Sequence, residues 1–139
     1  MKVLFDTNVL LDVILDRKPF ASPATLLLAE VERGNLQGYL CATTITTIYY
    51  LTAKTLGNRI AVEAVEKLLT IFEVAPVNRY VLETALSLGF RDFEDAVIYA
   101  AARWIESDVL VTRDERGFQS TYPVVMSPQE LIALLHSLE

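Results

Sequence analysis

The feature that most limits the fold of this chain is an alternation of two kinds of apolar segment. Short runs rich in β-branched residues are too brief for helices, whereas the longer segments between them show helical spacing. Strands that alternate with helices form βαβ units, in which helices cover the faces of a parallel sheet. We expect about five strands of the usual length, at residues 2–5, 38–41, 72–75, 108–112 and 123–126.

The longer segments predict helices after Asp6 and over residues 23–33, 60–72, 80–88 and 94–105. The last helix opens with a serine cap at Ser127, a proline, and Glu130 at the third helical position. Residues 42–56 contain many β-branched side chains but end at a glycine, so we expect a helix capped by Thr43 or Thr44. Because the predicted strands are almost continuously apolar, both faces of the sheet should be covered. The prediction is an α/β protein with three α/β/α layers.

Length and composition narrow the class of protein. The chain has 139 residues, 53% of them hydrophobic, with 5 Gly and 5 Pro, which excludes a disordered or collagen-like chain. No linker or repeat divides it, so we expect a single domain over residues 1–139. The lone Cys41 gives no intrachain disulfide and favours a reducing cytoplasm. Asp6 and Asp12 interrupt the apolar N-terminus, and the longest uncharged stretch is polar, so we expect no membrane segment.

The charge balance is acidic. Twelve Lys and Arg residues stand against 18 Asp and Glu residues, which gives a net charge of −6. Affinity for nucleic acid rests mainly on cationic side chains that contact phosphates, so this balance argues against a protein that passively coats nucleic acid. If the chain acts on nucleic acid, a cation has to neutralise its own carboxylates.

Acidic residues fall where the predicted sheet would bind a ligand. Asp6 follows the first predicted strand, Asp114 follows the fourth, and the helix over residues 94–105 opens with Asp92, Glu94 and Asp95. Ligands of open parallel sheets bind beyond the carboxyl ends of the strands, and the crossover helices begin near that same edge. The three acidic positions are therefore expected at one rim of the sheet.

Each of these acids also has a purely local explanation. Asp6 can cap a helix, Asp114 can stabilise a turn, and Asp92 and Asp95 have the spacing of a capping residue and its reciprocal partner. Taken together they repel one another unless a divalent cation lies between them. Oxygen ligands without a Cys/His cluster indicate Mg²⁺ or Mn²⁺ rather than zinc. Mg²⁺ usually shares its coordination with substrate phosphate, so the expected reaction is metal-assisted hydrolysis of a phosphate ester.

Three motifs in this order resemble the PIN-domain family of metal-dependent nucleases, which includes VapC-like toxins of bacterial toxin–antitoxin pairs. They are the segment 3–8, VLFDTN, the segment 93–103, FEDAVIYAAAR, and the segment 110–114, LVTRD, followed by a phenylalanine. The resemblance covers essentially the whole chain and implies a Mg²⁺- or Mn²⁺-dependent ribonuclease. It makes Asp6, Asp95 and Asp114 the catalytic, metal-binding acids, with Asn8 in support and Thr112 lining the site.

One position departs from the family pattern. PIN nucleases usually carry a fourth acid on the helix after the second strand, and that position falls on Thr47 here. Three explanations are open. Asp92 or Glu94 replaces the missing acid, the site binds metal weakly, or the domain has lost catalysis and only binds RNA or a protein. We expect Asp92 to be the fourth metal ligand. Residues three apart share a helix face, and Asp95 is already expected to point into the site. Glu94 is expected to point elsewhere.

The expected partners follow from the same resemblance. RNA is the expected substrate, an antitoxin protein is a possible partner, and a homodimer is expected. Cationic residues near the motifs would hold the phosphodiester backbone around the acidic centre; they are Arg17, Lys18, Arg91, Arg113 and Arg116. Phosphatases of the haloacid-dehalogenase type also begin with an acid after the first strand, but they need an aspartate where Asn8 stands.

Overall fold

The computed structural model describes residues 1–118 and 122–139. Five parallel strands form one sheet in the order β3-β2-β1-β4-β5. The strands are β1 (Lys2–Phe5), β2 (Gln37–Cys41), β3 (Glu73–Ala75), β4 (Val109–Val111) and β5 (Val124–Met126). The prediction of a parallel five-stranded α/β sheet is confirmed, with strand ends that differ by at most one residue.

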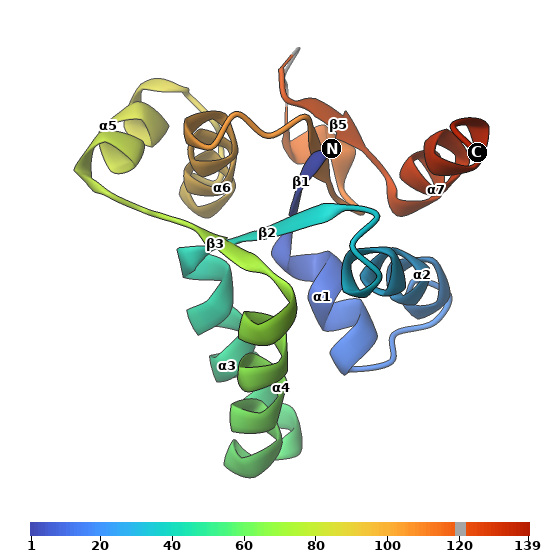
Figure 1. Ribbon diagram of the computed structural model, residues 1–139. Coiled ribbons are helices and arrows are strands. Elements are labelled where there is room, and N and C mark those ends of the chain that lie inside the picture. The colour runs from blue at the N-terminus through green and yellow to red at the C-terminus, as the bar shows by residue number, and fades with distance from the viewer. Residues whose placement is uncertain (119–121) are drawn as a thin grey trace.

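Helices occupy the connections, as Figure 1 shows. A short 3₁₀ turn, η1 (Glu115–Gly117), follows β4. The α-helices are α1 (Thr7–Ile14), α2 (Ala21–Glu32), α3 (Ala42–Leu56), α4 (Asn58–Ile71), α5 (Arg79–Ser87), α6 (Phe93–Trp104) and α7 (Pro128–Ser137). Among the described residues, none of these helices is long and apolar enough to cross a membrane.

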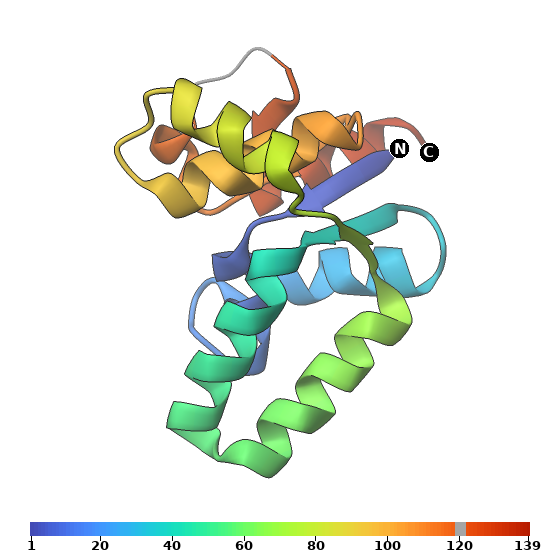
Figure 2. The same cartoon turned by 90° about the vertical axis from the view of Figure 1, so that its left-hand side faces the viewer.

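The direction of the crossovers explains which helices cover which face. The chain first moves from β1 to β2 and β3, then returns past β1 to β4 and β5. Since βαβ crossovers are right-handed, this reversal puts α5 and α6, which connect β3 to β4, on the opposite face from α1 to α4. Accordingly, α1, α2, α7 and the α3–α4 pair share one apolar cluster, and α5 and α6 share another. Figures 1 and 2 show α5 and α6 together, away from α1 and α2, with α3 and α4 running antiparallel.

Alternation along the central strand joins the three layers. Val3 and Phe5 of β1 are buried against the α1, α2 and α7 side, whereas Leu4 between them is buried against α6. Leu110 of β4 lies in the same cluster as Leu4. Burial on both faces is what the unbroken apolar runs predicted, and it makes β1 a fixed base for the residues that follow it.

One local prediction was wrong. Helix α3 begins directly after β2, with Cys41 at the capping position and no side-chain hydrogen bond there. Thr44 is instead buried in the first turn, where its hydroxyl shares a 2.8 Å hydrogen bond with the hydroxyl of Thr7 in α1. Tertiary contact between two helices therefore uses the threonine that the local pattern assigned to a cap. The helix ends at Gly57 as predicted, with a φ of 95° that favours glycine.

Candidate active site

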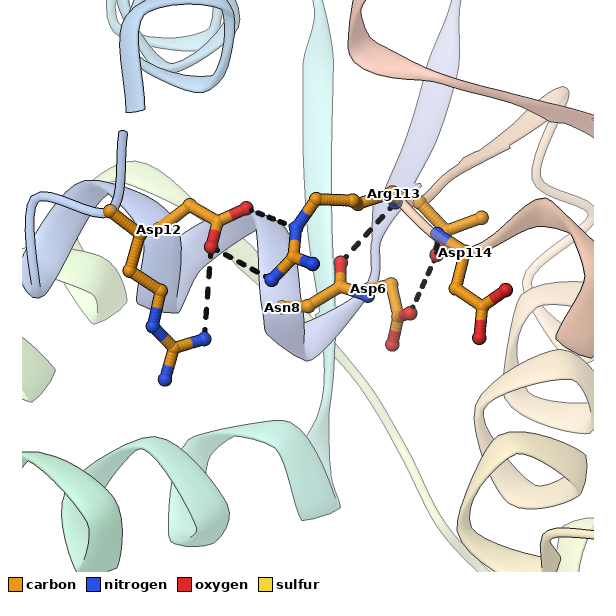
Figure 3. Close-up of polar contacts among 7 residues, drawn as sticks. Asp6, Asn8, Asp12, Arg113 and Asp114 are labelled. Atoms are coloured by element: carbon orange, nitrogen blue, oxygen red, sulfur yellow. Dashed lines mark hydrogen bonds and ion pairs between the residues drawn. The ribbon is translucent and has the colours of Figure 1, made fainter. Parts of the chain in front are cut away.

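The acidic residues meet where the order of the strands reverses. One branch of the chain extends from β1 through β2, and the other extends from β1 through β4, so the carboxyl ends of β1 and β4 flank a topological switch point. Open α/β sheets bind ligands in the crevice at such a point. Asp6 directly follows β1, and Asp114 lies just beyond β4. Figure 3 shows their carboxylates pointing to the same side of the strand ends.

Asp6 is buried, with 5% of its surface exposed. One carboxylate oxygen accepts a 2.8 Å hydrogen bond from the backbone N–H of Thr7, which caps α1, and the other accepts a 2.8 Å bond from the hydroxyl of Thr112. Burial raises the pKa of Asp6, the two hydrogen bonds oppose that rise, and the charges of Glu94 and Asp114 add to it. Asp6 thus caps α1 and also belongs to the acidic cluster.

Thr112 links the two strand-end acids. Its fully buried hydroxyl donates to Asp6 and accepts a 3.0 Å hydrogen bond from the backbone N–H of Asp114. A hydroxyl can donate once and accept as well, so this side chain fixes both acids in one arrangement. The predicted position of Thr112 beside the site is therefore where the structure has it.

The third acid comes from the start of α6. Asp92 caps this helix, and its carboxylate accepts a 3.1 Å hydrogen bond from the backbone N–H of Asp95. Asp95 stands in the first turn, where burial and then the charges of Asp6, Asp92, Asp114 and Glu94 raise its pKa from 3.8 to about 7. A carboxyl group held so far from its ordinary pKa marks a place where negative charges are forced together, as functional sites often do.

The expectation that Glu94 points away from the site was wrong. Its carboxylate accepts a hydrogen bond from the Thr47 hydroxyl of α3 at 3.4 Å, and its charge raises the pKa of both Asp6 and Asp95. Helix α3 packs close to α6, and this contact draws Glu94 towards the cleft. Thr47, where the resemblance predicts a fourth acid, therefore contacts a carboxylate that α6 provides.

An open cleft of about 220 Å³ lies between Asp6, the start of α6 and the Thr47 side of α3. Both Asp92 and Glu94 line it, so helix spacing alone did not decide between them. The polar residues of its wall are Asp6, Thr7, Asn8, Thr47, Asp92, Glu94 and Asp95.

Gly117 is a site residue that the sequence reasoning missed. A Cβ atom at this position would lie 3.1 Å from a carboxylate oxygen of Asp95 and 3.8 Å from one of Asp114. The turn after β4 therefore approaches the acids closely only because residue 117 has no side chain. A glycine shortly after a strand-end acid was the available signal, but the Asp95 carboxylate that it faces comes from α6.

Arg113 lies beside the site but its guanidinium is turned away from it. It donates two hydrogen bonds, of 2.8 and 3.0 Å, to the carboxylate of Asp12 in α1 (Figure 3). It also lies 4.2 Å from the centre of the Phe20 ring. Its backbone N–H donates to the Asn8 side-chain oxygen at 3.4 Å. Asn8 and Asp12 thus both anchor the turn that carries Asp114. The expectation that Arg113 would face a phosphodiester is wrong in this structure, and buried Asp12, an acid within an apolar helix, was the missed signal.

The donor chemistry of the cleft fits a hard divalent cation. Within residues 1–118 and 122–139, no three Asp, Glu, His or Cys side chains are arranged to hold a metal ion by themselves. Mg²⁺ is commonly bound through one or two carboxylates together with water and substrate phosphate, so it does not require such a cage. Asp6 and Asp95, whose charges repel, have the oxygen atoms that this kind of binding needs.

Comparisons with known proteins agree with the resemblance of the sequence motifs to the PIN-domain family. A family model described as PIN domain matches residues 2–116. The chain is 24% identical over 134 residues to Ribonuclease VapC1 of Aquifex aeolicus, and the match covers 93% of this chain and 92% of that protein.

Solved structures share the fold. A toxin–antitoxin complex from Klebsiella pneumoniae is similar with a TM-score of 0.69 and 23% identity, over 91% of this chain and 97% of that chain. The sarcin–ricin loop cleaving toxin VapC20 of Mycobacterium tuberculosis has a TM-score of 0.68 and 19% identity, over 83% and 92% of the two chains. The extent of the family match, together with acids at the carboxyl ends of β1 and β4, establishes that this chain belongs to the PIN domain family.

Proposed function

We propose that this protein is an endoribonuclease that hydrolyses RNA phosphodiester bonds with the help of Mg²⁺ or Mn²⁺. The observation that carries the proposal is the set of carboxylates that follows β1 and opens α6, because these groups line one open cleft. Together with the charge of Asp114 and with burial, they raise the pKa of Asp95 to about 7. Similarity to a named ribonuclease over 93% of the chain supports the same reaction.

Asp6, Asp95 and Asp114 would hold the cation in this reaction. A bound divalent cation lowers the pKa of water and stabilises the negative charge that develops on a phosphate under attack. Hydrogen bonds from Thr7 and Thr112 keep the Asp6 carboxylate in a single orientation, so it needs little reorganisation to bind. The Asn8 bond to the Arg113 backbone holds the turn that presents Asp114.

We assign the fourth carboxylate to Glu94, with Asp92 kept as the cap of α6. One oxygen of Asp92 is already committed to the Asp95 N–H, whereas Glu94 reaches Thr47 across the cleft. Glu94→Gln is then expected to reduce cleavage more strongly than Asp92→Asn. The sequence-based choice of Asp92 would be restored if the two variants behaved in the reverse order.

A toxin role is the biological setting we propose. One solved relative in fold is a toxin–antitoxin complex, so a small protein antitoxin is the proposed partner of this chain. Co-purification with the product of an adjacent reading frame, and relief of growth inhibition by it, would test this role separately from catalysis. A homodimer remains a prediction, checked by light scattering.

The test of catalysis compares single carboxylate changes. Wild-type protein with Mg²⁺ or Mn²⁺ should cleave single-stranded or structured RNA, and Asp6→Asn or Asp95→Asn should lower the rate by about a hundredfold or more, as the loss of one aligned catalytic group commonly does. Asp16→Asn is the matched control, because Asp16 is an exposed residue at the end of α1. Circular dichroism would verify that each variant is folded.

Cleavage that persists in excess EDTA, or in the Asp95→Asn variant, would contradict the proposal. The alternative of a degenerate RNA-binding domain is decided by titrating Mn²⁺ into the protein by calorimetry. Mn²⁺ binding that weakens in Asp95→Asn supports the metal-dependent ribonuclease. RNA binding without any Mn²⁺ binding supports the degenerate RNA-binding domain.

A further inference from the structure

A second hollow adjoins the acidic cleft. It has a volume of about 250 Å³ and shares Asp92 and Asp95 with the cleft, so these two residues form the wall between them. The rest of its lining comes from the loop before α6 and from η1, and includes Leu88, Phe90, Arg91, Arg116 and Gly117. A chain molecule lying across the wall would therefore pass from an acidic surface to one that carries two arginines.

These arginines differ from the others in the molecule. The other arginines of the described residues contact a carboxylate or an aromatic ring; they are Arg17, Arg33, Arg59, Arg79, Arg103 and Arg113. Within residues 1–118 and 122–139, Arg91 and Arg116 have no such ion pair or ring contact, and both are exposed. Two guanidinium groups that lack an anion thus converge on one hollow next to the acids.

The hollow has a fixed apolar side. Phe90 packs edge-on against Tyr99 at 5.4 Å and against Phe118 at 6.3 Å between ring centres. These contacts join the loop that carries Arg91 to α6 and to the segment after η1. A preformed aromatic surface beside cationic groups is typical of sites that bind single-stranded nucleic acid.

We propose that this hollow binds the RNA phosphate next to the scissile one, through Arg91 and Arg116. The inference rests on the proposed ribonuclease function, since the scissile phosphate is the one in the acidic cleft. Guanidinium groups bind phosphate through paired N–H donors, and the carboxylates of Asp92 and Asp95 repel a phosphate placed over the wall. The strand is therefore held with one phosphate on each side of that wall.

The proposal narrows the class of substrate. Binding in the hollow needs a nucleotide beyond the bond that is cut, so the preferred substrate is an internal bond of an RNA strand. A dinucleoside monophosphate, which has only the scissile phosphate, leaves Arg91 and Arg116 without a ligand and should be cleaved poorly.

The first experiment measures binding without turnover. In the Asp95→Asn background with Mg²⁺, the affinity for a fluorescent 20-nucleotide single-stranded RNA is followed by anisotropy from 50 to 200 mM KCl. The change Arg91→Met with Arg116→Met should weaken binding about tenfold at low salt and reduce the slope of log K against log salt by about 0.7, the value for one lost single-strand phosphate contact. Arg59→Met, in the first turn of α4, removes an exposed arginine that does not line the hollow, and it should leave the slope unchanged.

The second experiment places the lost contact on the substrate. In the RNA that the wild type cleaves, a neutral methylphosphonate replaces the phosphate on one or the other side of the cut. One of these two substrates should be cleaved about tenfold more slowly by the wild type, and this penalty should vanish in the double arginine variant. The side that shows the penalty gives the direction of the strand.

Several results would overturn the proposal. Equal salt slopes for the Arg91/Arg116 double variant and Arg59→Met would exclude a phosphate contact in the hollow, as would methylphosphonate penalties that persist in the double variant. If the wild type cleaves no RNA, the ribonuclease function fails, and the binding experiment alone then decides the phosphate site. Thermal melting of each variant separates loss of binding from loss of fold.

Discussion

Single residues at this site combine structural and functional demands. Asp6 caps α1 with one carboxylate oxygen and meets Thr112 with the other, so its geometry is set before any ligand arrives. The same burial that fixes it also raises its pKa, because the charged form loses water. Local order and electrostatic strain therefore come from one side chain.

Gly117 provides a residue-scale prediction. A Cβ in Gly117→Ala would stand 3.1 Å from the Asp95 carboxylate, so that carboxylate has to shift. We expect cleavage to fall about tenfold or more, since catalysis is sensitive to small displacements, while the midpoint of urea unfolding changes little because the position is at the surface of a turn. Parallel cleavage assays and urea titrations would check this.

Gly34→Ala is a control for that substitution. Nothing lies within 4 Å of a Cβ at Gly34, but its φ of 81° disfavours alanine, so it should lose stability and keep its cleavage rate. Unchanged cleavage by Gly117→Ala would show that the Asp95 carboxylate tolerates the displacement.

At the scale of elements, the ion pair between Asp12 and Arg113 joins α1 to the turn after β4. Asp12 is 2% exposed, and Arg113 contacts it through two hydrogen bonds, so the helix that starts at Asp6 also holds the segment that carries Asp114. Asp6 and Asp114, which are distant in sequence, are thus both positioned by α1.

Breaking that connection should affect both stability and activity. Asp12→Asn keeps the side-chain volume but removes the charge that Arg113 meets, and we expect about 2 kcal/mol less free energy of unfolding together with slower cleavage. Urea unfolding and initial cleavage rates would measure both effects. Arg17→Met is the matched change, because Arg17 is more exposed and 3.7 Å from Asp12, and it should cost less than about 1 kcal/mol.

At the scale of the whole molecule, the acidic cluster opposes folding when it is fully charged. In the unfolded chain Asp95 titrates near its ordinary pKa of 3.8, but in the folded protein its pKa is about 7. Between these values the folded state binds more protons than the unfolded state, so this residue lowers stability as pH rises, and its full penalty is present above pH 7.

The pH dependence of melting tests this account. In metal-free protein, the melting temperature of Asp95→Asn should exceed that of the wild type by an amount that grows from pH 4 to 7 and then levels off, because the variant cannot charge. Adding Mn²⁺ at pH 8 should raise the melting temperature of the wild type more than that of the variant. A difference that shrinks as pH rises would contradict the raised pKa, and Asp16→Asn is the control for a surface carboxylate.

The sequence by itself determined the fold class and the acids at the strand ends. Apolar runs and helical periodicity are local properties of the chain, and together with the right-handed crossover they specify a parallel sheet, its covering helices and the edge at which Asp6 and Asp114 emerge. The motifs around Asp6, Asp95 and Asp114 could also be recognised in the sequence, because each is a contiguous stretch of the chain, and together they indicated the family.

Only the tertiary structure decided how side chains from different elements meet. Glu94 turns towards the cleft because Thr47 of α3 lies across from it, and Arg113 turns away because Asp12 lies buried beside it. Neither partner is near in sequence, so periodicity and capping rules could not find them. The direction of a side chain at this edge of the sheet depends on packing between helices. The sequence therefore identifies the acids, but only the packing decides how their side chains are arranged.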